Sequence, residues 1–74
     1  MSHNLATCPL LTPVTITQLS LDKDNVFRLQ RLGFKPSTSL QVILRHKHHV
    51  VVVIKGVRYG LDSKSARCIE VVHD

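Results

Sequence analysis

Hydrophobic and polar residues alternate along four segments of the chain, and this period of two predicts β-strands. The four segments are 13–20, 38–45, 57–61 and 67–72. A fifth segment, 49–55, is apolar at successive positions, which is typical of a central strand or one covered on both sides. Between the first two strands, apolar residues recur at helical spacing. The pattern therefore predicts five short strands, with one helix after the first.

The alternation also predicts which side chains share a face of each strand. In the first strand, Val14 and Ile16 lie on one side with Gln18, whereas Leu19 lies on the other. In the later strands, one face is expected to hold Leu40, Val42 and Leu44, and another Val57, Tyr59 and Leu61, with Tyr59 toward the core. Ile69 and Val71 are expected on the inner side of the last strand.

The helix is predicted to begin after Asp22, a residue type that caps helix N-termini well. Leu21 and Val26 stand where a hydrophobic staple is formed. The expected apolar stripe consists of Val26, Phe27, Leu29 and Leu32.

The end of the helix carries a specific stop signal. Gly33 stands where a left-handed residue ends a helix, and Pro36 prevents its continuation. Leu29 and Phe34 occupy the two positions that touch in a Schellman ending. The segment 29–36 therefore predicts a helix end closed by its own hydrophobic contact.

The remaining segments complete the predicted architecture. Residues 1–12 contain Pro9, followed by Pro13, and we expect an extended arm packed by Leu5, Leu10 and Leu11. Lys55-Gly56 marks a tight turn, and residues 62–66 predict a single helical turn before the last strand. Short strands and tight turns favour a small, closed or nearly closed β-barrel. We expect one domain over residues 13–74.

The composition indicates which partners and which location to expect. The chain has 74 residues and a net charge of +5, which indicates an acidic partner such as nucleic acid, a membrane surface or an acidic protein. Cys8 and Cys68 are expected to be reduced thiols. We expect no signal peptide, because the N-terminus lacks a basic region followed by an apolar stretch. The longest apolar run, 50–54, is too short to span a membrane, and we expect a cytoplasmic location. That run leaves room for self-association if one face is exposed.

Three histidines lie in the segment 45–50. On a strand, His46 and His48 would share one face, and imidazoles bind zinc, copper and nickel. A metal site needs three or four ligands, and here only two converge. The alternative is the polar tip of a hairpin. We expect no metal and no cofactor, with His46 and His48 as the candidates if a metal does bind.

Other chemistry is sparse. The serines lie at turn and cap positions, and the glycines at 33, 56 and 60 are isolated rather than gathered in a phosphate-binding loop. We therefore expect a protein that is not an enzyme. Nucleic-acid binding is the alternative function, but it usually requires exposed aromatic residues, and Phe34 and Tyr59 are assigned to the interior. Charge alone would give weak, salt-sensitive binding.

Two motifs, 32-LGFKPSTSLQV-42 and 56-GVRYGLDSKSARCIEV-71, resemble the FeoA family. The matching positions are Leu32, Gly33, Phe34, Pro36, Leu40 and Val42, then Gly56, Tyr59, Leu61, Ala66, Ile69 and Val71. The chain departs from the pattern at Ser37, where the family usually has glycine, so the geometry of this turn is in question.

The resemblance implies an SH3-like barrel in a cytosolic, non-enzymatic accessory protein of bacterial ferrous iron uptake. Such proteins are thought to act with the membrane transporter FeoB, through its cytosolic GTP-binding portion, and to reach the membrane only through that partner. Similar domains end iron-dependent repressors, where they follow a winged helix and a dimerisation domain, and we expect neither of these in this protein. The resemblance therefore favours the transport accessory, with no nucleic acid as partner.

The helix stop also suggests a docking surface. We expect the corner at Gly33 and Pro36 to hold the helix across one mouth of the barrel, and to present Arg28, Arg31 and Lys35 beside an apolar groove. The alternative is that these cations only complement the dipole of the helix C-terminus.

Overall fold

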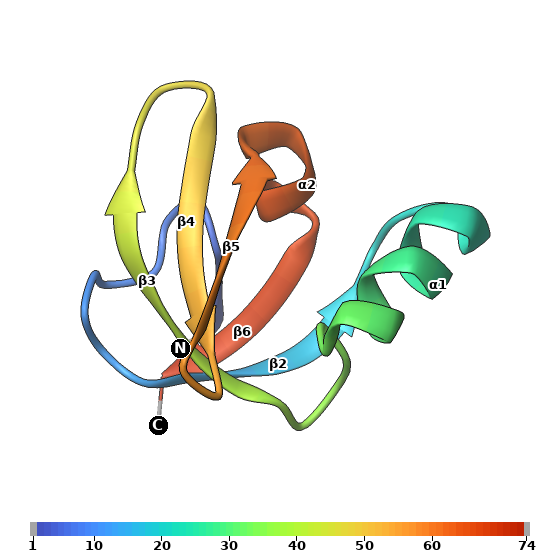
Figure 1. Cartoon of the computed structure of the whole chain (residues 1–74), viewed down its shortest axis with the longest axis horizontal. Helices are drawn as coiled ribbons and strands as arrows, with labels where there is room; N and C mark the ends of the chain where they lie inside the picture. Colours follow the sequence, from blue (N-terminus) through green and yellow to red (C-terminus); the bar gives the residue numbers. More distant parts are fainter. Residues whose placement is uncertain (1, 74) are drawn as a thin grey trace.

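The computed structural model describes residues 2–73, with Ser2 described by its backbone alone. The elements, in chain order, are β1 (Ser2–Asn4), β2 (Val14–Leu19), α1 (Lys23–Leu32), β3 (Ser39–Arg45), β4 (His49–Ile54), β5 (Val57–Asp62), α2 (Ser63–Arg67) and β6 (Ile69–His73). The strands form one sheet in the order β1-β6-β2-β3-β4-β5 (Figure 1). The sheet therefore has six strands, one more than the five expected.

The sheet curls because β3 changes partners along its length. Its first residues, Ser39 and Leu40, pair with β2, and the stretch from Gln41 to Arg45 pairs with β4. All five ladders are antiparallel. β1 and β5 are the two ends of the strand order. The predicted SH3-like barrel is confirmed, in its nearly closed form.

The interior is almost entirely aliphatic. Its buried hydrophobic residues are Leu5, Cys8, Val14, Ile16, Leu29, Phe34, Leu40, Val42, Val50, Val52, Ile54, Leu61, Ala66, Ile69 and Val71. No polar or charged side chain of the described part of the chain is fully buried. β4 pairs with β3 on one side and β5 on the other, which confirms it as a central strand.

Two β-bulges move side chains away from the faces expected for them. In β2 the register shifts between Ile16 and Gln18, so Leu19 packs against the core and Gln18 is exposed. In β3 the register shifts before Leu44, whose side chain is 46% exposed. A bulge adds one residue to a strand, so the side chains beyond it change faces. The expectations that Leu44 shares a face with Leu40 and Val42, and Gln18 with Val14 and Ile16, are therefore wrong.

The register of β5 is continuous, so Val57, Tyr59 and Leu61 share a face as expected, but they differ in burial. Val57 is 51% exposed because it follows directly from the turn after β4, at the rim of the barrel. Tyr59 is half-buried, and Leu61 is buried as expected.

The first residues of the chain belong to the sheet. Residues 2–4, expected in an extended arm, form β1 and pair with β6. Leu5 is fully buried, as expected, and its N–H is shared between one carbonyl of α2 and one of β6, both at 3.2 Å. Leu10 and Leu11 are 46% and 68% exposed, so their expected packing is wrong. The backbone there follows the outside of β3, with the Leu11 N–H donating to the Val42 carbonyl at 2.8 Å.

Arg45 fastens the turn that follows β1. Its Nη2 donates to the carbonyls of Leu5 at 3.1 Å and Cys8 at 2.6 Å, and lies 3.7 Å from the Cys8 Sγ. Both cysteines, Cys8 and Cys68, are free thiols. Burial raises the pKa of the Cys8 thiol, although the Arg45 charge opposes this effect. Arg45 thus ties an irregular segment to the barrel through its backbone.

α1 begins and ends as the sequence predicts. The Asp22 side chain accepts from the Asn25 N–H at 3.4 Å, which caps the N-terminus. Gly33 is left-handed with φ of 110°. The Phe34 N–H donates to the Leu29 carbonyl at 3.0 Å, the long bond of a Schellman ending.

The face of α1 that packs on the barrel is narrower than expected. Leu29 is its one buried residue, and Val26 is half-buried. Phe27 and Leu32 are 64% and 45% exposed, so the apolar stripe expected to include them is wrong at these two positions. Figure 1 shows α1 at the side of the barrel, and most of its residues are exposed.

The turn after α1 keeps a left-handed residue without a glycine. Ser37 has φ of 77°, and its N–H donates to the Ile16 carbonyl at 2.8 Å. The conformation that glycine would provide is therefore preserved by a serine, at a cost of about 1–2 kcal/mol for a residue with a side chain. α2 lies where a helical turn was expected before the last strand. No helix within residues 2–73 is long and apolar enough to cross a membrane.

Candidate functional site

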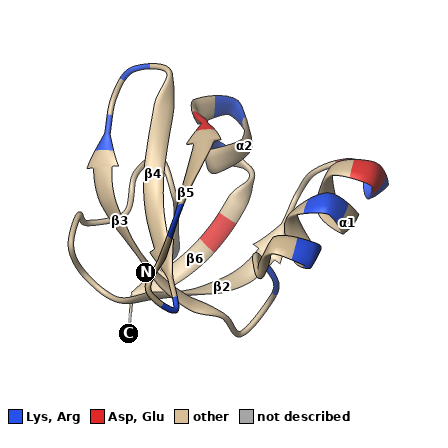
Figure 2. Cartoon of the chain, in the orientation of Figure 1, with Lys and Arg blue, Asp and Glu red and all other residues tan. Residues whose placement is uncertain are grey.

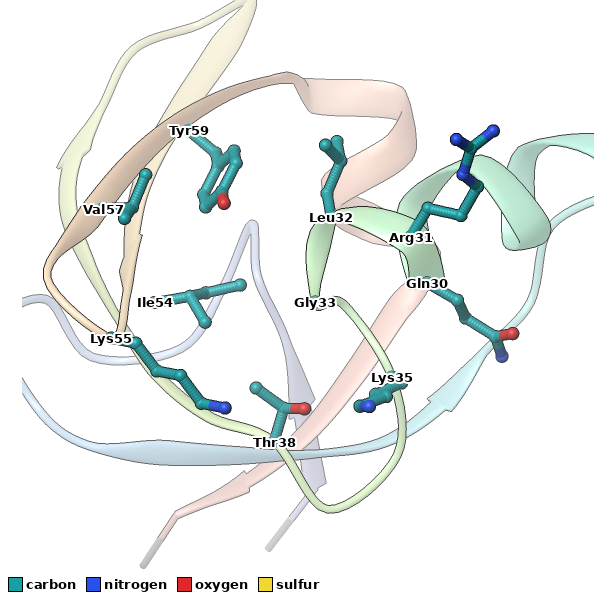
Figure 3. Close-up of a pocket in the computed structure, with 10 residues that line it drawn as sticks. All are labelled: Gln30, Arg31, Leu32, Gly33, Lys35, Thr38, Ile54, Lys55, Val57 and Tyr59. Carbon is teal, nitrogen blue, oxygen red and sulfur yellow. The ribbon is translucent and has the colours of Figure 1, made fainter.

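A hollow of about 300 Å³ lies between the end of α1 and the hairpin of β4 and β5 (Figure 3). Leu32 and Gly33 line it from the helix side, and Ile54, Val57 and Tyr59 line it from the hairpin. Figure 3 shows Leu32 and Tyr59 on the same side of this hollow, with Ile54 between Tyr59 and the corner at Gly33. Polar side chains, among them Gln30 and Thr38, line the rest, so the walls of this hollow are apolar and polar in similar measure.

A second hollow of about 310 Å³ continues along β5 toward α2. Arg28, Leu29 and Leu32 line it from α1, and residues 60–62 line it from β5. Leu32 borders both hollows, so they lie on either side of its exposed side chain. We refer to the two hollows together as the α1–β5 groove.

The floor of the groove is held by the residues of the helix stop. Phe34 is fully buried, and its ring meets Tyr59 edge-on, with 5.5 Å between ring centroids. A Cβ added at Gly33 would lie 3.7 Å from Cγ2 of Ile54, which is ordinary contact. Pro36, just beyond, is exposed. Because Leu29 and Phe34 are buried together with the core, the corner fixes the end of α1 against the barrel.

Cations border the groove, mostly at the end near the hairpin turn (Figure 2). Lys35 and Lys55 line the first hollow, and Figure 3 shows both side chains directed toward Thr38. Arg31 also lines it, but its guanidinium points away from the hollow and lies over the ring of Phe27, 5.9 Å from the centroid.

The second hollow carries both signs of charge. Arg28 lines it and donates to Oδ1 of Asn25 at 2.7 Å. Asp62 lies at its far end, where the neighbouring Ser65 side chain lowers the pKa of the carboxyl group. The groove is therefore basic toward the β4–β5 turn and mixed toward α2.

The three cations chosen from the sequence are thus divided between the two hollows. Arg31 and Lys35 border the first and Arg28 borders the second. Sequence reasoning missed Lys55, which the structure places opposite Lys35. The Lys55-Gly56 turn was predicted, and its φ values of 50° and 80° are those of a tight hairpin turn. Nothing in the sequence placed that turn beside the helix stop.

The histidines lie at the far end of the barrel from this corner. β3 ends at Arg45 and β4 begins at His49, so His46 and His48 are in the connection, and the interpretation that they share a strand face is wrong. The rings that meet are those of His46 and His49, 4.9 Å apart at their centroids. Among the residues that the structure describes, no three His, Cys, Asp or Glu side chains gather to hold a metal ion.

The valine run offers little surface for self-association. Both edges of β4 are hydrogen-bonded, and the outward side chains of Val51 and Val53 are half-buried. The groove is the better candidate for contact with another molecule, because it combines exposed apolar side chains with exposed cations. Such a surface binds a partner by burial and charge.

Comparison with known proteins identifies the fold and the family. The crystal structure of an iron uptake regulatory protein (FeoA) is 18% identical, covers 96% of both chains and has a TM-score of 0.87. The solution structure of the FeoA protein from Chlorobium tepidum is 18% identical over 96% of this chain and 70% of that one, with a TM-score of 0.87. A manganese-dependent transcriptional repressor is 22% identical with a TM-score of 0.88, but this chain spans only 42% of it.

These similarities show the shared fold, and the sequence adds the family. No curated protein matches the chain. The family model for the FeoA domain, in contrast, matches residues 3–73. The chain therefore belongs to the FeoA family, which is associated with ferrous iron uptake.

Proposed function

We propose that this protein is a cytoplasmic, non-catalytic accessory protein of ferrous iron uptake, and that it binds the cytosolic GTP-binding portion of a FeoB-type membrane transporter through the α1–β5 groove. Family membership supports the iron uptake system. The observation that carries the docking surface is that Lys35 and Lys55 line the same hollow as the exposed apolar side chains of Leu32 and Val57.

The apolar part of the groove supplies the binding energy in this proposal. Leu32 and Val57 are 45% and 51% exposed, and both border the first hollow. Burying apolar surface contributes about 25 cal/mol per Å² removed from water. A partner that covers these two side chains would therefore gain affinity without any rearrangement of the barrel core.

The cations provide orientation and rate. Three cations of the first hollow are exposed: Arg31, Lys35 and Lys55. An acidic surface of the partner can therefore approach them directly from solvent. Charges at the rim of an interface increase association rates and exclude partners of the same sign. This part of the binding should weaken as salt concentration rises.

Charge reversal tests the proposal. The purified GTP-binding portion of the transporter is titrated with the wild-type protein and with the double variant Lys35→Glu/Lys55→Glu. We expect at least about a tenfold loss of affinity, the equivalent of about 1.4 kcal/mol. A second pair, Arg28→Glu/Arg31→Glu, separates the helix cations from those of the hollow, and Lys47→Glu/Lys64→Glu, at the other end of the barrel, is the matched control. Equal affinity for all three variants and wild type would reject the groove as the docking site.

Nucleic-acid binding is the second candidate function. It is favoured by the net charge of +5 and by Phe27, which is 64% exposed with Arg31 above its ring. One aromatic side chain gives a single stacking position, whereas non-specific single-strand binders use several. Sub-micromolar binding of an oligonucleotide that falls steeply with salt and is abolished by Phe27→Ala would favour this function.

A further inference from the structure

β5 is an edge strand, and its free edge faces α1 across the groove. It stands at one end of the strand order, and among the described strands it pairs only with β4. The second hollow is lined by residues 60–62 of β5 on one side and by Arg28 and Leu32 of α1 on the other. An edge strand presents a row of backbone donors and acceptors that can pair with another chain.

The hairpin geometry shows which backbone groups face the groove. Ile54 pairs with Val57 across the two-residue turn at Lys55-Gly56, where both φ values are positive. In such a hairpin the closing pair is hydrogen-bonded, and along the ladder bonded and non-bonded pairs alternate. The residues of β5 that form hydrogen-bonded pairs with β4 are therefore Val57, Tyr59 and Leu61. The N–H and C=O groups of Arg58 and Gly60 consequently point away from β4, toward the free edge.

Gly60 leaves this edge open to close approach. Gly60 is exposed, and a Cβ built there would meet no atom within 4 Å, so no side chain stands beside the backbone at this position. Leu32 and Val57 provide exposed apolar surface beside the same edge. Strand addition needs both features, because main-chain hydrogen bonds give affinity and neighbouring pockets select side chains.

The charges along the groove determine which charge the added segment must carry and which way it runs. Lys35 and Lys55 lie at the hairpin end of the groove, and Arg58 is exposed on β5 itself. Asp62 lies at the opposite end, near α2. A cation on an edge strand also discourages indiscriminate pairing, so a neutral or basic strand is disfavoured there. The complementary ligand is acidic where it meets the hairpin end.

We infer that the α1–β5 groove takes an extended, acidic peptide segment of the partner protein, which adds to the free edge of β5 as a further strand through the backbone of Arg58 and Gly60. This inference rests on the proposed function, since it specifies how the same groove binds its partner. Strand addition depends on the backbone of Arg58 and Gly60 at the free edge of β5. The proposed function depends only on the charged and apolar side chains that border the groove.

A defined peptide tests strand addition directly. The probe is a fluorescent heptapeptide of alternating valine and glutamate, and its binding is followed by fluorescence anisotropy and by amide shifts in NMR spectra. We expect saturable binding, with the largest shifts along β5 and the end of α1. The same peptide methylated on its backbone amides keeps its side chains but loses its donors, and we expect it not to bind. Equal binding of the methylated peptide, or no binding of the parent, would overturn the inference.

Two variants at one position locate the interaction. Gly60→Pro removes an N–H that the fold does not use, whereas Gly60→Ala keeps it and places its methyl group in open space. We expect about tenfold weaker peptide binding for Gly60→Pro, as for the loss of a hydrogen bond, and near wild-type binding for Gly60→Ala. Thermal melting of both variants verifies that they are folded, and equal peptide affinity for folded Gly60→Pro and Gly60→Ala would contradict the inference.

Binding measurements with the GTP-binding portion of the transporter distinguish failure of this inference from failure of the proposed function. If Lys35→Glu/Lys55→Glu weakens its binding and Gly60→Pro does not, the groove is the docking site but strand addition is wrong. If the wild-type protein does not bind the transporter portion while the peptide adds to β5, strand addition holds and the partner is another acidic protein.

Discussion

Two segments flank the barrel, and they are attached to it in different ways. The turn at residues 5–8 has no regular structure beyond a few turn hydrogen bonds, yet Leu5 and Cys8 are 0% and 1% exposed. α1 is a regular, well-capped helix, yet Leu29 is its only buried residue. The first segment is enclosed by α2, β6 and the Arg45 side chain, and the second is held mainly at its C-terminal end.

The difference separates stability from binding. The irregular turn fills the core and uses its backbone carbonyls to hold Arg45, so little of it is available to another molecule. The helix contributes one buried residue and a fixed end, which leaves Phe27, Leu32 and its arginines exposed. Regular secondary structure is therefore a poor guide to where this domain is held together.

The largest effect is expected at the buried turn. Leu5→Ala should lower the free energy of unfolding by about 2–5 kcal/mol, because it removes a fully buried side chain and leaves a cavity. Chemical denaturation measures the change. Leu11→Ala, at a side chain that is 68% exposed, is the control and should change stability by less than about 0.5 kcal/mol. Similar losses for the two variants would mean that the turn is not part of the core.

Arg45→Met tests the attachment of the same turn. The methionine keeps much of the aliphatic stem but loses hydrogen bonds to two carbonyls, which should cost about 1.5–3 kcal/mol. Arg58→Met, on the surface of β5, should cost little. Hydrogen exchange should show faster opening of β1 in Arg45→Met, while binding at the α1–β5 groove is retained. Loss of groove binding would contradict the separation of the two regions.

Gly33→Ala tests the fixed end of the helix. The expected loss is about 1–2 kcal/mol, because alanine resists the left-handed conformation that Gly33 adopts at φ of 110°. Space is not the cause, since the added Cβ makes only ordinary contact. Gly60→Ala provides the comparison at a glycine without positive φ, and its melting curve should stay near that of wild type. An unchanged melting curve for Gly33→Ala would show that the helix end is not fixed at this residue.

Ser37→Gly should have the opposite sign. Glycine relieves the cost of φ of 77°, offset in part by its greater freedom in the unfolded chain, so we expect a gain of up to about 1 kcal/mol. The control is Ser39→Gly, in the extended conformation of β3, which should lose about 0.5–1 kcal/mol. Thermal unfolding compares the two variants, and a loss for Ser37→Gly would mean that the serine side chain stabilises the turn.

The smallest effect concerns the start of α1 and depends on pH. A hydrogen bond from the Asn25 side chain lowers the pKa of Asp22. The ionised form therefore stabilises the fold above the ordinary pKa of the carboxyl group, and this contribution is lost as pH falls through the lower pKa of the folded state. Asp22→Asn caps the helix but does not titrate. Between pH 7 and pH 2, melting of the wild type should decline slightly more than melting of Asp22→Asn, and parallel curves would contradict this.

Local signals allowed the helix to be predicted from the sequence, because each acts within a few residues. Asp22, Leu29, Gly33 and Phe34 have the expected roles in capping and closing α1. The bulge that displaced Leu44 depends on the register of β3 with β4, which a local pattern does not contain.

The groove was less predictable for the same reason. Cations beside the helix stop were evident, but Lys55 reaches the groove only because the barrel curls and brings the β4–β5 turn to that corner. The burial of Leu5 was expected, whereas its attachment through Arg45, a residue 40 positions away, could not be inferred from spacing.

The pairing of β1 with β6 has a consequence for how the domain can be joined to other proteins. Ser2 lies opposite Val72, so the chain enters and leaves the barrel side by side (Figure 1). A few linking residues could connect these ends, and new termini opened at the exposed His46–His48 connection would give a circular permutant. The same proximity would let a host protein carry the whole barrel as an insertion in a surface loop.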